Sequence, residues 1–326
     1  MLPPMGPLKF IPLLKRIRWG GRRLGDVLGK SIGVEADYAE SWEICDLSAD
    51  QTLIAAGEFA GSPLRKLMQE HSPELLGRHS GESEFPLLIK FLDARDRLSV
   101  QVHPDDDLAA AAFIRGGRGK TEAWVILAAE PGSRVFAGLK PGVTAASLRQ
   151  HLDRGRVAEC LHEVEVSAGD CLYIPAGTVH AIGEGILLAE VQQSSNVTFR
   201  LFDWNRVGGD GKLRELHIEQ SLTCIDFARG PVHPVVPTPL LHAGPESELL
   251  ASCPYFTIHR HVVERPLSFP DDNRCRIVIA LEGTSECVSS GERHHVRKGE
   301  TILIPAAGHP ATLEPQPRAV VLEVFW

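Results

Sequence analysis

GDCLYIPAGTVH, residues 169–180, and GETILIPAAGH, residues 299–309, share one pattern at an offset of 130 residues. Each stretch begins with glycine and an acidic residue, continues with apolar residues, and reaches Ile-Pro-Ala and then histidine. A repeat of this kind indicates two copies of one β-rich unit. In the second copy His309 comes one residue early, and Pro310 stands at the position equivalent to His180.

A glycine-acid turn, a short strand, Pro-Ala-Gly and histidine are typical of a cupin jelly roll, in which such a strand carries a metal ligand at its end. We therefore predict a mainly β protein of two cupin-type jelly-roll β-barrels with a few inserted helices. The shift of His309 turns its side chain to the other strand face, so we expect the second barrel to lack a metal. The proline-rich residues 230–239 indicate a linker between a catalytic domain at residues 1–229 and a cupin-like domain at residues 230–326.

Short apolar runs separated by Gly, Pro and Asp predict strands along most of the chain. We expect strands at residues 86–92, 98–103, 121–128, 171–174, 186–193 and 197–202. Gly-Glu-Gly at residues 183–185 resembles a hairpin turn. Helical spacing of apolar residues predicts helices within residues 62–70, 144–160 and 212–227, and Thr144 is a candidate N-cap.

The chain of 326 residues has 34 Lys and Arg against 42 Asp and Glu, a net charge of -8. This balance argues against a general binder of nucleic acid or anionic membranes, because either needs a basic surface. No apolar run is long enough to predict a transmembrane helix, and the N-terminus lacks a secretory signal pattern. Seven scattered cysteines without a C-x-x-C pair indicate free thiols. Together these features predict a cytoplasmic protein.

Four polar residues on predicted strands form a candidate metal site. Gln101 and His103 alternate with two valines, so the polar pair shares one face of its strand. Glu122 begins another strand, and His180 ends the first repeat. Two imidazoles, one carboxylate and one amide oxygen suit zinc, and also manganese, cobalt or iron. The surplus positive charge of such a metal would stabilise an enediolate.

Other charged residues stand close to apolar runs. Lys120, at a strand entrance, is a candidate proton carrier or anion binder. Glu190 and Arg200 flank the polar segment of residues 191–199. Arg200 emerges in a strand-like run, where it could bind phosphate or an oxyanion. Lys90 stands alone in an apolar run, so it is either buried with a partner or on an edge strand that reaches solvent.

The motifs resemble those of type I mannose-6-phosphate isomerases (phosphomannose isomerases), in particular the short bacterial form. The resemblance runs in order through WGG (19–21), FPLLIKFLDA (85–94), LSVQVHPDD (98–106), GKTEAW (119–124), IPAGTVHA (174–181) and RELHI (214–218). It covers roughly two thirds of the chain, and the C-terminal third matches mainly through the second repeat.

The resemblance implies an aldose-ketose isomerase that interconverts mannose 6-phosphate and fructose 6-phosphate with one Zn²⁺ per chain. The four zinc ligands that it implies are the residues already selected by spacing: Gln101, His103, Glu122 and His180. It places Lys120 and Arg200 in the active site. We expect the substrate, a small sugar phosphate, to be bound by Arg200, Lys90 and Trp19.

We expect proton transfer between C1 and C2 through an enediol. Lys120 is the first choice as acid and base if burial and the metal lower its pKa, and Glu190 is the second. Where the family usually has Asp after the Gln-Ser-Ser stretch, this chain has Asn196, which cannot act as a base. A non-catalytic, sugar-phosphate-binding regulatory cupin is therefore an alternative. A cupin oxygenase fits Gln101 poorly, because such sites use mainly several histidines and a glutamate. The sequence leaves the oligomeric state open.

Overall fold

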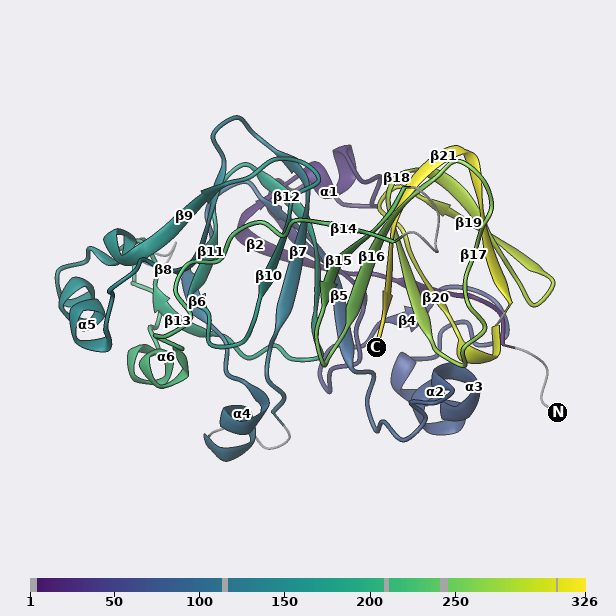
Figure 1. The fold of residues 1–326 in the computed structure, drawn as a ribbon, viewed down its shortest axis with the longest axis horizontal. Coiled ribbons are helices and arrows are strands. Elements are labelled where there is room, and N and C mark those ends of the chain that lie inside the picture. The colour runs from purple at the N-terminus through teal and green to yellow at the C-terminus, as the bar shows by residue number, and fades with distance from the viewer. Residues whose placement is uncertain (1–4, 113–116, 208–210, 241–245, 309) are drawn as a thin grey trace.

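The protein is described by a computed structural model over residues 5–112, 117–207, 211–240, 246–308 and 310–326. It is mainly β, with its strands in three sheets. Figure 1 shows two strand-built halves side by side, with β6, β8, β9, β11 and β13 on the left, and the yellow C-terminal strands together with the N-terminus, β4, α2 and α3 on the right. The predicted fold class is confirmed.

Two antiparallel sheets build the first half. The six-stranded sheet, in the order β10-β7-β12-β5-β3-β2, contains β2 Leu13–Gly21, β3 Tyr38–Ile44, β5 Leu87–Ala94, β7 Glu122–Ala129, β10 Cys171–Ile174 and β12 Ile186–Gln193. The five-stranded sheet, in the order β13-β6-β11-β8-β9, contains β6 Val100–Val102, β8 Arg134–Leu139, β9 Leu161–Glu165, β11 His180–Ile182 and β13 Phe199–Phe202. Apolar side chains of both sheets, among them Trp124 and Ile182, form a shared core.

All six predicted strands are present, and β10 and β12 have the predicted bounds. The predicted hairpin at residues 183–185 is wrong, because β11 and β12 belong to different sheets. The turn instead passes from one sheet to the other, and Gly183 N–H donates to Arg134 O at 3.0 Å. A Cβ at Gly183 would lie 2.0 Å from that oxygen, so the crossing requires glycine.

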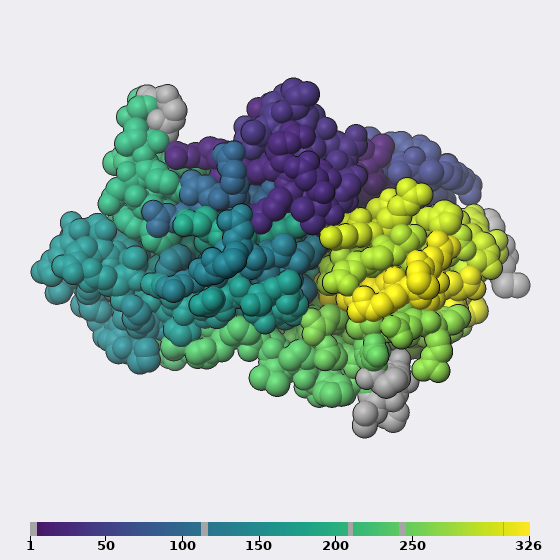
Figure 2. Space-filling view, turned by 90° about the horizontal axis from the view of Figure 1, so that it is seen from above, coloured from purple at the N-terminus to yellow at the C-terminus, as the bar shows by residue number. Residues whose placement is uncertain are grey.

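The second half is one ten-stranded sheet in the order β14-β15-β16-β21-β18-β20-β1-β4, with β17 paired to β21 and β19 to β18. Its strands are β1 Leu8–Ile11, β4 Leu53–Ile54, β14 Thr238–Pro239, β15 Ser247–Ser252, β16 Thr257–Val263, β17 Leu267–Ser268, β18 Arg276–Ser289, β19 Glu292–Arg297, β20 Thr301–Ile304 and β21 Ala311–Phe325. Two of them, β1 and β4, come from the N-terminal region, and Figure 2 shows the purple N-terminal residues against both halves. The division of the chain at residue 229 stays a prediction.

The sequence repeat corresponds to a structural repeat, since β10 and β20 lie 130 residues apart. Gly169 N–H donates to Ile126 O at 2.8 Å, and Gly299 N–H donates to Ala280 O at the same distance. Both glycines have positive φ, +94° and +80°. Strands β7 and β18 are therefore equivalent partners of β10 and β20. His309, from which the loss of the second metal was predicted, lies outside the described residues.

Six α-helices lie within the described residues, each nine residues or shorter: α1 Arg23–Asp26, α2 Leu64–Glu70, α3 Ser72–Leu76, α4 Asp106–Ala112, α5 Ala145–Asp153 and α6 Ile218–Cys224. Short 3₁₀ turns lie at Val157–Cys160 and Ala306–Gly308. The prediction for residues 62–70 corresponds to α2, and that for 144–160 to α5 and the first 3₁₀ turn. Thr144 caps α5 as predicted, because its hydroxyl accepts from Ser147 N–H at 3.2 Å.

The helix predicted over residues 212–227 is limited to α6. Leu213 and Leu216 are 68% and 39% exposed, so their helical spacing has no core to pack against. The chain before α6 follows β13 instead, and His217 N–H donates to Arg200 O at 2.7 Å. This extended path places His217 of the RELHI motif beside β13 of the first half.

The predicted linker runs along the first half rather than free of it. Val232 N–H donates to Ala137 O at 3.0 Å, and Val235 N–H donates to Cys171 O at 2.7 Å. All seven cysteines are free, as predicted, and six of them are buried. Within the described residues, none of the helices has the length and apolar character needed to span a membrane.

Candidate metal centre and active-site cavity

His103, Glu122 and His180 bring three metal-binding side chains together inside the first half. Glu122 begins β7, His180 begins β11, and His103 directly follows β6. The two carboxylate oxygens of Glu122 lie 3.5 Å from His103 Nε2 and 3.4 Å from His180 Nε2. All three side chains are buried. These separations suit ligands of one ion with bonds of about 2.0–2.2 Å.

Backbone carbonyl groups fix the orientation of both imidazole rings relative to the Glu122 carboxylate. His103 Nδ1 lies 2.8 Å from Val197 O, and His180 Nδ1 lies 2.9 Å from Thr178 O. A carbonyl only accepts hydrogen bonds, so each Nδ1 carries the proton and each Nε2 presents a lone pair to Glu122. Among the described residues, His180 Nε2 has no hydrogen-bond partner, which fits a metal ligand.

Burial keeps the two imidazoles neutral. It lowers the pKa of His103 well below 6.5 and that of His180 to about 4, and the positive charge of Lys120 acts in the same direction. A neutral imidazole is the form that binds a metal. The residues present therefore fit the metal that the resemblance implies.

We expect the metal-free chain to lose stability as the pH falls from 6.5 towards 4. In this window the unfolded chain binds protons that buried His103 and His180 do not, so the free energy of unfolding falls by up to about 1.4 kcal/mol per pH unit for each histidine. This stabilisation is fully present above pH 6.5. Urea unfolding of chelator-treated protein between pH 4 and 7.5 measures it. His180→Gln should reduce the slope, and an unchanged slope would contradict the assignment.

Gln101, the fourth predicted ligand, lies directly opposite His180 in the pairing of β6 with β11. Residues opposed in this way project from the same face of the sheet. Gln101 also lines the cavity that contains Glu122. The pairing of β6 with β11 thus places the Gln101 side chain on the sheet face from which His180 projects.

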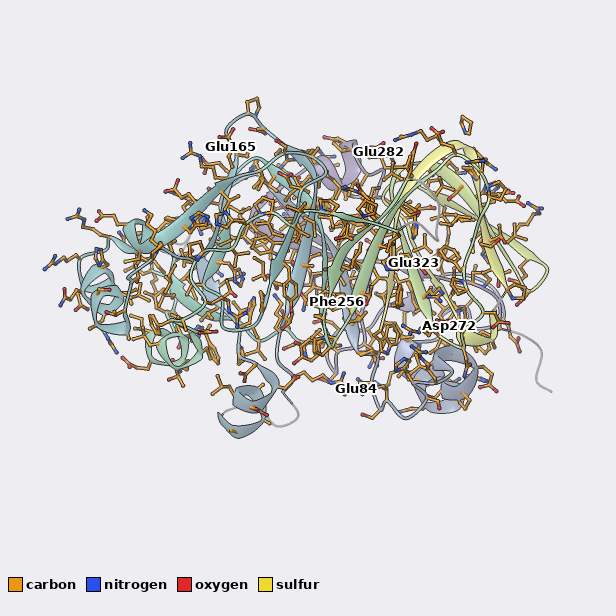
Figure 3. All side chains as sticks on the ribbon, in the orientation of Figure 1. Glu84, Glu165, Phe256, Asp272, Glu282 and Glu323 are labelled. Carbon is orange, nitrogen blue, oxygen red and sulfur yellow. The ribbon has the colours of Figure 1, made fainter. Side chains whose placement is uncertain are left out.

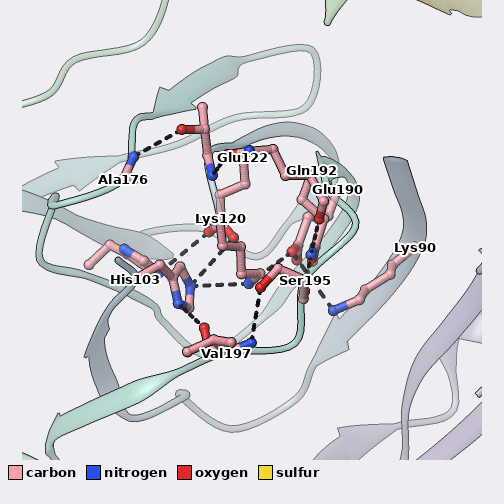
Figure 4. A network of polar contacts seen from close by, with 12 residues as sticks. Lys90, His103, Lys120, Glu122, Ala176, Glu190, Gln192, Ser195 and Val197 are labelled. Atoms are coloured by element: carbon pink, nitrogen blue, oxygen red, sulfur yellow. Dashed lines mark hydrogen bonds and ion pairs between the residues drawn. The ribbon is translucent and has the colours of Figure 1, made fainter. Parts of the chain in front are cut away.

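Lys120 lies against the donors, as Figure 4 shows. Its Nζ is 2.7 Å from Glu122 Oε2, 3.0 Å from His103 Nε2 and 3.5 Å from Glu190 Oε1. Burial lowers the Lys120 pKa, but the carboxylates of Glu122 and Glu190 raise it by more, and the net pKa is above 10.5. In the metal-free chain Lys120 therefore carries a proton, and the lowered pKa on which its role as a base depends stays a prediction for the metal-bound site.

Lys90 is buried on β5, which pairs with β12 on one side and β3 on the other. The edge-strand alternative is therefore excluded. The ammonium lies 3.7 Å from Glu40 and 3.9 Å from Glu190 and 4.9 Å above the Trp42 ring. These groups compensate its charge inside the sheet.

A cavity of about 250 Å³ opens beside the metal-binding side chains. The predicted site residues that line it are Trp19, Lys90, Gln101, Lys120, Glu122, Glu190 and Arg200. Asn196 also lines it and is exposed. Arg200 is held by a hydrogen bond from its guanidinium to Glu215 O at 2.9 Å. The fold thus brings the side chains predicted from separate motifs to one cavity.

Three residues at or beside the candidate site were missed by the sequence prediction: Glu40, Gln192 and Arg214. Gln192 lies opposite Glu122 between β12 and β7, is fully buried, and has an Oε1 without a partner among the described residues. Its position two residues after Glu190 was the available signal, because both face the same side of a strand. Arg214 belongs to the RELHI motif, whereas the sequence around Glu40 gives no signal.

Fold and site together define a mainly β, cupin-type protein with a His-Glu-His metal-binding group at a cavity lined by lysine, arginine and carboxylate side chains. The description "Phosphomannose isomerase type I, catalytic domain" matches residues 8–125, and "Mannose-6-phosphate isomerase, cupin domain" matches residues 246–324. The chain belongs to the type I phosphomannose isomerase family.

Individual relatives agree with this family. The chain is 37% identical to a mannose-6-phosphate isomerase of Streptococcus mutans over 88% of each chain. It is 35% identical to mannose-6-phosphate isomerase ManA of Bacillus subtilis over 92% of this chain and 93% of the relative. A crystal structure of the mannose 6-phosphate isomerase from Bacillus subtilis matches with a TM-score of 0.89 at 25% identity, covering 99% of this chain and 100% of the other. The prediction of an isomerase is confirmed over that of a non-catalytic regulatory cupin.

Proposed function

We propose that the cavity interconverts D-mannose 6-phosphate and D-fructose 6-phosphate through an enediol, with zinc as the bound metal. The observation that carries this proposal is the meeting of His103, Glu122 and His180 beside the buried Lys120 and Glu190. A zinc ion bound by the two histidines, Glu122 and Gln101 would polarise the substrate oxygens and stabilise negative charge on them. Proton transfer and binding of the phosphate would be carried out by side chains of the protein.

We propose Glu190 as the group that moves the proton between C1 and C2, and Lys120 as the donor to the oxygen that becomes negative. This order reverses the sequence expectation, because Lys120 carries a proton in the metal-free chain and can donate it. Glu190 is buried, and its Oε1 has no hydrogen-bond partner among the described residues. Lys120 Nζ and Lys90 Nζ lie 3.5 and 3.9 Å from this oxygen, so the carboxylate is held in place by charge and can exchange a proton with the substrate.

Asn196 does not oppose this assignment. It is exposed at the cavity, whereas Glu190 and Lys120 are buried and 3.5 Å apart. The proton transfer that we propose uses only these buried groups and needs no carboxylate at position 196. The departure from the usual Asp of the family is therefore compatible with catalysis.

We propose that Arg200 binds the phosphate and that Arg214 assists it. Both line the same cavity, and Arg200 Nε is buried without a hydrogen-bond partner among the described residues. Burial and then Arg214 lower the Arg200 pKa, so a dianion between the two guanidinium groups would relieve unfavourable charge. Trp19 and Lys90 would border the sugar.

Arg214→Gln should raise KM for mannose 6-phosphate about 10-fold or more, because a charge-assisted hydrogen bond contributes about 1.5–3 kcal/mol. A coupled assay of fructose 6-phosphate formation measures the change. Arg149→Gln, in which an exposed arginine paired with Glu219 is replaced, is the matched control and should leave KM unchanged. A KM equal to wild type in Arg214→Gln would remove Arg214 from phosphate binding.

The same assay tests the substrate. We expect turnover of mannose 6-phosphate and a much lower kcat/KM for mannose, which offers no charge to Arg200. Equal kcat/KM values for the two sugars would contradict the phosphate specificity. Absence of turnover in zinc-loaded protein would contradict the proposed function as a whole.

A further inference from the structure

A second group of metal-binding side chains lies inside the second half of the molecule: His259, His261 and Glu323. Glu323 Oε2 is 3.3 Å from His259 Nδ1 and 3.1 Å from His261 Nε2. The corresponding distances around Glu122 in the first half are 3.5 and 3.4 Å. Figure 3 labels Glu323 among the strands of the second half.

Strand pairing shows that the second group does not take the place of the first metal-binding group, but that of Glu190 and Lys90. The repeated strands end at Ile174 in β10 and at Ile304 in β20. Ile174 pairs with Glu122 at the start of β7, and Ile304 pairs with Arg276 at the start of β18. Arg276 therefore stands where the first half has its carboxylate ligand.

The equivalence extends to the neighbouring strands. In the first half Glu190 of β12 lies opposite Lys90 of β5. In the second half Glu323 of β21 lies opposite His259 of β16 and, on its other side, opposite Val278 of β18. Val278 belongs to the apolar cluster enclosed by this half. Directly opposed residues share a face, so Glu323 and His259 project into the second interior, as Glu190 and Lys90 project into the first.

We propose that His259, His261 and Glu323 bind a divalent metal ion as a second metal site of the chain. Two imidazoles and one carboxylate form a ligand set that binds zinc in many proteins. Ser247 Oγ lies 2.7 Å from His261 Nδ1, and this contact holds Nε2 towards Glu323. The His259 side chain is 19% exposed, which gives an ion a route from solvent.

Arg276 lies beside this site without occupying both carboxylate oxygens. Its Nη1 is 3.1 Å from Glu323 Oε1, while Oε2 faces the histidines. In the first site a cation also contacts the carboxylate, but there Lys120 Nζ lies 2.7 Å from Glu122 Oε2, the oxygen that faces His103. Asp272, 2.7 Å from Arg276 Nη2, shares the charge of the guanidinium. Because only three donors meet here, whereas Gln101 adds a fourth at the first site, we expect weaker binding than at the first site.

The sequence expectation of a metal-free second barrel rested on the position of His309. The donors found here come from β16 and β21 instead. The shift of His309 therefore has no bearing on whether they bind an ion.

Zinc binding to the full chain tests the proposal. Protein stripped with a chelator and titrated with Zn²⁺ alone should bind two ions per chain, one tightly and one more weakly. His261→Gln should bind one ion tightly, and Glu122→Gln should bind one ion weakly. Cobalt substitution gives a second readout, because His261→Gln should lose the absorption bands of the weaker ion. None of these measurements depends on isomerase activity, so they stand apart from the test of the proposed function.

His295→Gln is the matched control, because His295 is an exposed histidine 3.3 Å from Glu286. It should keep two ions per chain and thereby exclude binding by surface histidines. One ion per wild-type chain at saturating zinc would overturn the proposal, even if His261→Gln failed to fold. Two ions bound to folded His261→Gln would overturn it as well.

Discussion

Glu190→Gln should lower kcat by about 10²–10⁴-fold while leaving the metal at the first site bound, since this is the usual contribution of a positioned acid or base. Gln keeps the size of the side chain but cannot accept and return a proton. Glu190 also lies within 4 Å of Lys90 and Lys120, so loss of its charge should change the pH profile of kcat. Steady-state kinetics from pH 6 to 9, together with the metal content, measure both effects.

Glu163→Gln is a suitable control, because Glu163 is an exposed carboxylate that pairs with Arg134. It should leave kcat unchanged. Glu190→Asp keeps the charge and should restore part of the lost rate. A wild-type kcat in Glu190→Gln would exclude Glu190 as the proton carrier and return attention to Lys120.

Glu122→Gln should remove the metal of the first site and lower kcat/KM at least about 10³-fold, the upper range found when one group that stabilises a developing oxyanion is lost. Glu122 contacts both histidines and provides the anionic donor. An amide at this position lacks the charge that offsets the ion and leaves Lys120 without its nearest partner. Metal analysis and the coupled assay on the same sample measure the two losses.

Lys120 would have a lowered pKa in this variant, so the loss of activity alone would not identify the metal as its cause. Adding excess zinc to Glu122→Gln distinguishes an effect of metal loss from an effect of the changed Lys120 pKa. If zinc restores both metal content and activity, Glu122 is not required as a ligand. Full activity without bound metal would contradict the role of the metal in the reaction.

Much of the fold was predictable because strand spacing and the repeat are local features of the sequence. The strands β10 and β12 follow from apolar runs that each come after a glycine-containing turn. The donors of the first site were predictable for a related reason, since alternation on β6 placed Gln101 and His103 near one face. Thr144 was recognisable from the preference of helix N-caps for hydroxyl side chains.

The errors and omissions concern features that depend on long-range pairing. The glycines at residues 183–185 indicate a turn, but not that its two strands enter different sheets. Leu213 and Leu216 have helical spacing, yet burial depends on a surface that the rest of the fold does not supply. The pKa of Lys120 depends on Glu190, 70 residues away in sequence. Likewise, only the pairing of β16 with β21 brings Glu323 to the two histidines of the second half.

The central claim is that the His103, Glu122 and His180 site holds a metal needed for isomerisation of mannose 6-phosphate. The most direct test is a coupled assay of fructose 6-phosphate formation on the protein as purified, after chelation, and after zinc is returned. We predict activity in the first sample, loss of activity in the second, and recovery in the third. Activity that persists in protein shown to contain no metal would contradict the account.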